Sequence, residues 1–122
     1  LSILEIFSKN WSDEAMFSYI KTGFLNIKKQ DIYSLENYCK KWGIKGSKWY
    51  SKDWEYDALN KDLEKLNNLR KIIVEPLLKL KNELDASKTA EQITVKLYEF
   101  IEENQIKKES VTLDFSNIDV YS

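Results

Sequence analysis

The sequence predicts a mainly α-helical fold, a bundle of about four to five helices with one long helix and a short extended C-terminal segment. Three observations lead to this prediction. Apolar residues recur every three or four positions from residue 59 to residue 84, a helix-start signal stands at residues 12–14, and Gly23 and Gly43 follow stretches with helical periodicity. The 122 residues fit one domain, so we expect residues 1–122 to share one core.

The first predicted helix covers residues 13–22. Ser12 can cap it, and the acidic Asp13 and Glu14 suit the positive end of the helix dipole. Gly23 can adopt the left-handed conformation that ends a helix. The apolar residues Phe17, Ile20 and Phe24 recur on one side.

A second helix is predicted to begin at Gln30 or Asp31 and to end before Gly43. Its apolar residues are spaced by three and four positions, and the glycine can end it as Gly23 ends the first. They are Ile32, Leu35, Cys39 and Trp42.

From about Ser51 the periodicity predicts one long helix with an inward-facing stripe of apolar side chains. Pro76 interrupts this stretch and removes a backbone hydrogen bond, so we expect a kink or a new helix start near Glu75. The stripe consists of Leu59, Leu63, Leu66, Leu69, Ile73, Leu77, Leu80 and Leu84.

Ala86 and Ser87 predict a turn, followed by a helix over residues 89–104 with Ser87 or Thr89 as its cap. This helix should be buried through Ile93, Leu97, Phe100 and Ile101. Beyond it, Val111, Leu113 and Phe115 alternate with polar residues, which predicts one short strand or an extended tail.

The composition is typical of a globular cytoplasmic protein. Hydrophobic residues make up 43% and charged residues 32%, and a formal charge of -1 provides no global field toward nucleic acid or anionic lipid. Cys39 is the single cysteine, and we find neither a signal sequence nor an apolar run that could span a bilayer. A chain that begins at Leu1 with an apolar segment also suggests an internal fragment of a longer protein.

Catalytic, metal and cofactor sites are not expected in this chain. It has no histidine and only one cysteine, which removes imidazole catalysis and cysteine-based metal centres. The segment 43–48 misses the spacing of a phosphate loop, and its G-x-x-G pattern lacks the sheet of a KH domain. Asp62, Glu64 and Lys65 could hold Mg²⁺ as in a nuclease, but a solvated helix face is favoured.

The stretch from Lys40 to Tyr56 interleaves lysines with aromatic residues. Exposed rings could stack on unpaired bases while the lysines neutralise phosphates. Alternatively, Trp42, Trp49 and Trp54 pack in the core with lysines outside, and this interpretation is favoured. Gly43 and Gly46 permit a sharp turn that would expose Lys45 and Lys48. The candidate contacts to the DNA backbone are Lys45, Lys48 and Lys52, which cluster beside this turn, with Trp49 as a further candidate.

Two stretches together resemble the AddB family, a component of bacterial ATP-dependent helicase-nucleases. They are FSYIKTGFL at residues 17–25 and LENYCKKWGIKG at residues 35–46. The similarity continues more loosely through residues 70–80, which include the letters EPLL, and through residues 89–106. It is weakest beyond Ser110.

The resemblance implies an internal piece of a longer subunit that acts with an AddA partner on DNA double-strand breaks in recombinational repair. It further implies that the piece corresponds to the helical 2B-type insertion of helicases. The family's phosphate loop, nuclease carboxylates and cluster cysteines match no residues here. We therefore expect a non-catalytic module that reaches DNA through the parent complex, without a membrane or small-molecule partner; the alternative is a structural or protein-interaction domain without DNA contact.

Overall fold

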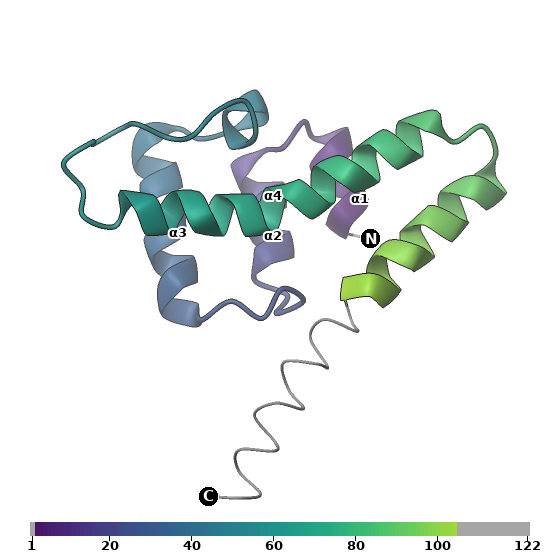
Figure 1. Ribbon diagram of the computed structural model, residues 1–122, viewed down its shortest axis with the longest axis horizontal. Coiled ribbons are helices and arrows are strands. Elements are labelled where there is room, and N and C mark those ends of the chain that lie inside the picture. Colours follow the sequence, from purple (N-terminus) through teal and green to yellow (C-terminus); the bar gives the residue numbers. More distant parts are fainter. Residues whose placement is uncertain (1, 105–122) are drawn as a thin grey trace, which may run out of the picture.

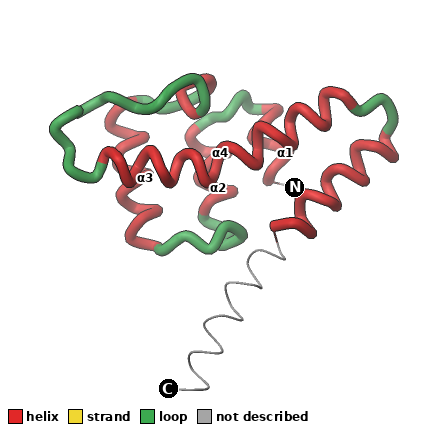
Figure 2. The backbone as a smooth tube through the Cα atoms, viewed as in Figure 1, coloured by secondary structure: helices red, strands yellow, loops and turns green. Residues whose placement is uncertain are grey.

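The computed structural model describes residues 2–104, and these residues form helices and loops without a strand (Figures 1 and 2). The helices are α1 (Ser2–Ser8), α2 (Asp13–Ile20), α3 (Lys29–Trp42), the short 3₁₀ helix η1 (Gly46–Trp49) and α4 (Leu63–Ala86). Residues 90–104 are also helical. The mainly α fold class predicted from the sequence is confirmed. The strand or extended tail predicted near residues 111–115 lies outside the described residues.

The helices pack in chain order, α1 against α2, α2 against α3 and α3 against α4. In Figure 1, α4 runs across the shorter helices, and the chain then turns back along it as the 90–104 helix. One cluster of buried apolar side chains joins all of these elements. Its largest fully buried members are Trp11, Trp49, Tyr19, Ile6, Met16, Ile20, Leu35, Ile44, Ile73, Leu77, Leu80 and Val74.

The predicted helix starts and stops are largely confirmed. The Ser12 side chain accepts a hydrogen bond from the Ala15 amide at 3.2 Å, as an N-cap should. Gly43 closes α3 in the left-handed conformation and donates its N–H to the Cys39 carbonyl. Gly23 does have a positive φ, but α2 is capped by Lys21, two residues earlier.

The long helix begins later than the sequence predicted. Residues 51–62 form a loop, and Leu59 is 95% exposed, so the prediction that this residue faces inward was wrong. Asp57 adopts a positive φ and its carbonyl accepts the Asn60 N–H at 2.8 Å, which makes a turn there. The Asn60 side chain then accepts the Asp62 N–H, again at 2.8 Å. A backbone turn at Asp57 and a hydrogen bond to the Asn60 side chain therefore outcompete the apolar periodicity until Leu63.

Pro76 lies inside α4 without ending it. A new helix start near Glu75 does not occur, although the axis of α4 changes direction along its length in Figure 1. The buried face of α4 carries Leu66, Arg70, Ile73, Val74, Leu77 and Leu80. Packing along this face keeps the helix continuous despite the missing backbone hydrogen bond.

The 90–104 helix is capped as predicted, since Thr89 Oγ1 accepts the Gln92 N–H at 3.1 Å. Its burial is weaker than predicted. Phe100 is buried and Leu97 and Ile101 are partly buried, whereas Ile93 is exposed, so the prediction for Ile93 was wrong. Within residues 2–104, no helix combines the length and the hydropathy that crossing a bilayer requires.

Candidate nucleic-acid interface

The residues between α3 and α4 that we call the lysine loop are 43–56. Gly43 and Gly46 both have positive φ, and Ile44 between them is buried. This turn leaves Lys45 on the surface, as the sequence predicted. Lys48, within η1, and Lys52, just after it, are exposed as well.

Tryptophans anchor the lysine loop to the helices. Trp49 is 0% exposed, and its ring lies 5.9 Å from that of Phe17 and 5.5 Å from that of Trp54. Trp54 is also buried, and its indole N–H donates to the Lys48 carbonyl at 2.8 Å. The core interpretation of these rings is therefore correct. Because Trp49 has no accessible surface, its candidacy as a DNA contact is withdrawn.

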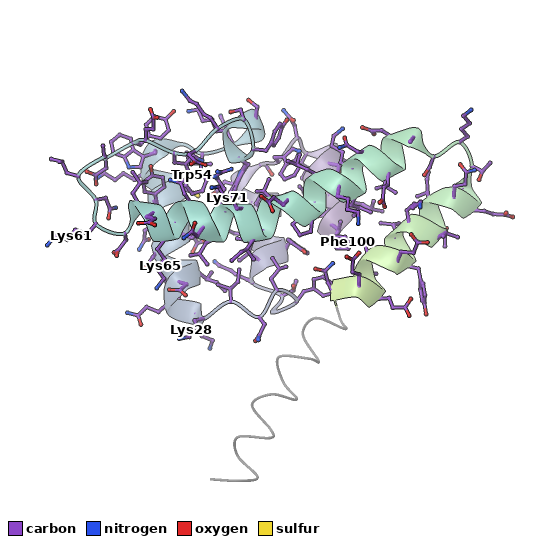
Figure 3. All side chains as sticks on the ribbon, viewed as in Figure 1. Lys28, Trp54, Lys61, Lys65, Lys71 and Phe100 are labelled. Carbon is purple, nitrogen blue, oxygen red and sulfur yellow. The ribbon has the colours of Figure 1, made fainter. Side chains whose placement is uncertain are left out.

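The side chain of Asn67 in α4 forms hydrogen bonds with the backbone of the lysine loop. Its side-chain oxygen accepts the Trp54 N–H at 2.8 Å, and its side-chain nitrogen donates to the Trp54 carbonyl at 3.0 Å. This pair of bonds satisfies both backbone groups of Trp54, as a neighbouring strand would. Figure 3 shows Trp54 between the loop and α4.

Arg70 adds a second attachment one turn further along α4. It is the single arginine of the chain and is only 5% exposed. Its guanidinium donates to the Trp49 carbonyl at 3.1 Å, to the Asn67 side-chain oxygen at 3.3 Å and to the Asp53 carboxylate. It also lies 5.8 Å from the centre of the Trp54 ring. Three acceptors at different positions suit the fixed fork of arginine and would not suit lysine.

The sequence contains a signal for the buried role of Arg70 that the prediction above missed. Arg70 stands four residues after Leu66 and three before Ile73, on the buried stripe. A lone arginine on an apolar helix face needs fixed acceptors, and the lysine loop supplies them. Asn67, one turn earlier, gave no comparable signal.

The electrostatics of the lysine loop favour anions. Asp53 is held by Arg70 and lies 3.8 Å from Lys71 Nζ, so its charge is largely compensated. Lys48 Nζ lies 5.6 Å from the centre of the Tyr56 ring and leans over that ring. Glu55 is the other acid of the loop and is exposed. Three lysines against Glu55 and the compensated Asp53 leave a local excess of positive charge that the net charge of the chain lacks.

A second aromatic pair lies at the edge of the lysine loop. The rings of Trp42 and Tyr56 stack with centroids 5.4 Å apart and planes at 14°. Tyr56 is 39% exposed, Trp42 is partly buried, and Lys41 Nζ lies 5.3 Å from the Trp42 ring. These rings already contact each other and two lysines, so a base would have to displace Lys48 or Lys41 to stack on them.

Burial shifts the pKa values of two titratable groups near the lysine loop. Burial raises the pKa of the Cys39 thiol far above its ordinary value, which keeps it protonated and unreactive. Burial also raises the pKa of Tyr38 to about 12, and the Tyr38 hydroxyl donates to the Tyr56 carbonyl at 2.8 Å. Among residues 2–104, no three metal-ligating side chains gather closely enough to hold an ion. Lys65, which the sequence analysis considered together with Asp62 and Glu64, forms an ion pair with Asp31 at 2.9 Å.

Curated relatives match most of this chain, and each is named as the B component of an ATP-dependent helicase/deoxyribonuclease. The relative from Clostridium novyi is 43% identical over 100 residues, which cover 82% of the chain and 9% of the relative. Those from Clostridium tetani and Clostridium kluyveri are 35% and 37% identical, covering 87% and 98% of the chain. No family model matches.

The chain matches a fragment of the AddB family. The resemblance drawn from residues 17–25 and 35–46 is thus confirmed. The chain spans about a tenth of the length of the curated AddB relatives it matches. The names of those longer proteins include helicase and deoxyribonuclease activities.

Proposed function

We propose that this chain is a non-catalytic helical module of an AddB-like helicase-nuclease subunit, and that its lysine loop contacts the DNA backbone. The observation that carries this function is the exposure of Lys45, Lys48 and Lys52 on a loop whose backbone is fixed by Asn67 and Arg70. Cations on a prepositioned loop can meet phosphates without first paying the entropy of ordering the chain.

The names of the relatives support a proposal for the biological setting of this module. An ATP-dependent helicase and deoxyribonuclease moves along and cuts DNA, so a module with backbone contacts would help hold the strand or duplex. We propose that the parent subunit works in the cytoplasm with an AddA-like partner in the resection and recombinational repair of double-strand breaks. The same proposal places this module at the 2B-like insertion of the parent subunit. It also holds that the module binds no cofactor and carries out no chemistry.

The direct test is charge reversal at the three lysines. We expect Lys45→Glu, Lys48→Glu and Lys52→Glu together to weaken binding of labelled DNA by roughly tenfold or more, and to flatten the dependence of affinity on salt. The matched control reverses three exposed lysines outside the lysine loop, Lys28, Lys61 and Lys88. Equal effects of the two triple variants would contradict the proposal.

A second candidate function is a structural or protein-interaction domain without DNA contact. The 90–104 helix supports it, because Val95 and Tyr98 are large apolar residues that are exposed there, together with Ile93. A subunit in which this module only docks neighbouring domains would give flat DNA titrations at low and moderate salt. Substitution of Val95 and Tyr98 would then disturb assembly of the parent subunit while leaving its DNA affinity unchanged.

A further inference from the structure

An open pocket of about 400 Å³ lies beside the lysine loop, where the connection between α1 and α2 meets the start of η1. Its lining comes from two segments that are far apart in the sequence. Each lining residue except Gly46 has an amine, amide or hydroxyl group in its side chain, and no acidic residue is among them. The lining residues are Lys9, Asn10, Ser12, Lys45, Gly46 and Ser47.

The two segments are fixed against each other by the backbone. The Gly46 N–H donates to the Trp11 carbonyl at 3.1 Å, and Trp11 itself is buried, with its ring 5.0 Å from that of Tyr50. A side chain at Gly46 would begin 3.7 Å from the Asn10 amide nitrogen, and the positive φ of Gly46 also favours glycine. The two backbone segments that carry the pocket are therefore held together before any ligand arrives.

Asn10 and Trp11 are both in the left-handed region, with φ of 52° and 57°. Such a conformation is costly for a bulky residue such as tryptophan, by about 1–3 kcal/mol. Burial of the Trp11 ring offsets this cost. The resulting sharp turn brings Lys9 and Ser12 to the same pocket as Lys45.

We propose that this pocket binds a phosphate of the DNA backbone, with Lys9 supplying a second cation beside Lys45. Asn10 and Ser47 would donate hydrogen bonds to phosphate oxygens. Ser12 Oγ accepts the Ala15 N–H, which leaves its hydroxyl hydrogen available to donate. This role rests on the proposed function, because the pocket extends the DNA path from the lysine loop to the α1–α2 connection.

Three carboxylates near the pocket oppose an anion. Glu5 Oε2 lies 3.8 Å from Lys9 Nζ, and Asp13 and Glu14 follow Ser12 in the first turn of α2. The Glu5–Lys9 pair is about half exposed on both sides, so it is a weak, salt-screened interaction that a phosphate can replace. Removing the Glu5 charge should therefore strengthen phosphate binding, which a variant that merely damaged the fold would not do.

The test measures affinity of the 122-residue chain for fluorescein-labelled DNA at several salt concentrations. We expect Lys9→Gln to weaken binding by roughly three- to tenfold and to lower the salt slope by about 0.7–0.9, the value for one phosphate contact. Glu5→Gln should strengthen binding by about twofold at low salt. Lys88→Gln, which removes an equal charge at the turn after α4, should leave affinity unchanged.

Two results would overturn the pocket. In the first result, Lys9→Gln has the same DNA affinity as Lys88→Gln, and Glu5→Gln has no effect. If reversal of Lys45, Lys48 and Lys52 still weakened binding, the proposed phosphate site would be wrong and the proposed function would stand. If none of these variants changed DNA affinity, both would fall. Thermal unfolding followed by circular dichroism should give wild-type midpoints for Lys9→Gln and Glu5→Gln, since both side chains are about half exposed.

Discussion

The lysine loop and the 90–104 helix pack on different halves of α4 and are held in different ways. The loop has little regular structure, yet it places two buried tryptophans in the core and is bonded by Asn67 and Arg70. The helix is regular and capped, but Phe100 is its single buried side chain within residues 90–104. An irregular segment can thus be anchored more strongly than a helix, because buried area and satisfied polar groups set local stability.

An open hollow of about 510 Å³ between α4 and the 90–104 helix illustrates the difference. Charged residues from both helices line it, among them Lys79, whose amine lies 3.9 Å from Glu103. Figure 3 shows Phe100 between the two helices, and its ring stacks on that of Phe24 at 6.1 Å. One buried ring, the partly buried Leu97 and Ile101, and the exposed Lys79–Glu103 ion pair should provide less docking energy than the two buried tryptophans of the loop. Substitutions in the two regions should therefore differ in how much stability they remove and in how far through the molecule their effects extend.

The largest effect is expected for Trp49→Ala. Truncating this fully buried ring leaves a cavity among Phe17 and Trp54, which should lower the free energy of unfolding by about 3–5 kcal/mol. Denaturant titration would measure it. The Cys39 thiol, protected by burial, should also react faster with a thiol reagent. A loss below about 1 kcal/mol would mean that the loop is not anchored through this ring.

Arg70→Lys should lower the free energy of unfolding by about 2–3 kcal/mol, even though the positive charge is kept. Lysine cannot reach the Trp49 carbonyl, the Asn67 side chain and the Asp53 carboxylate together. Lys71→Gln is the control, since it removes the exposed partner of the same aspartate and should change stability by no more than about 0.5 kcal/mol. If the two variants had equal unfolding midpoints in urea, the role assigned to the guanidinium fork would be wrong.

Phe100→Ala should have a smaller and local effect of about 1–2 kcal/mol, because the 90–104 helix can separate while the other helices stay packed. Amide hydrogen exchange should speed up in residues 90–104 and stay unchanged in α2 and α3. The rate of Cys39 modification should also stay at the wild-type value. Faster exchange throughout α3 would show that the helix supports the whole core after all.

The smallest effect is expected for Tyr98→Ser. This ring is 66% exposed, so its removal should change the unfolding free energy by no more than about 0.5 kcal/mol. Thermal melts compared with wild type would measure it. A clear loss of stability would instead reveal that Tyr98 is buried in solution, for example against a second copy of the chain.

Local sequence signals predicted the helices well where caps and periodicity agreed. Ser12, Gly43 and Thr89 each perform the capping role expected of them, because a cap depends on neighbouring backbone groups alone. The prediction that Leu59 faces inward was wrong because this residue fits the helical spacing but lies in a turn. The turn is formed by Asp57 and Asn60, on either side of Leu59, and it prevents a helix there. The exposed lysines of the candidate site were predictable from the glycines that turn the chain there.

Trp49 shows what periodicity and composition could not provide. A tryptophan among lysines is consistent with an exposed stacking surface or a buried anchor, and only the arrangement of Phe17, Trp54 and Arg70 around it decides. The pocket at Lys9 and Lys45 depends on the contact between Gly46 and Trp11, two residues with no local relation.

The amino-acid sequence by itself determined the helical fold class, the helix caps and the match to AddB, since each depends on residues that are neighbours in the chain. Tertiary structure alone decided which aromatic rings are buried, how Asn67 and Arg70 fix the lysine loop, and which lysines share a pocket. The physical reason is that burial and long-range hydrogen bonds depend on partners brought together only when the helices pack.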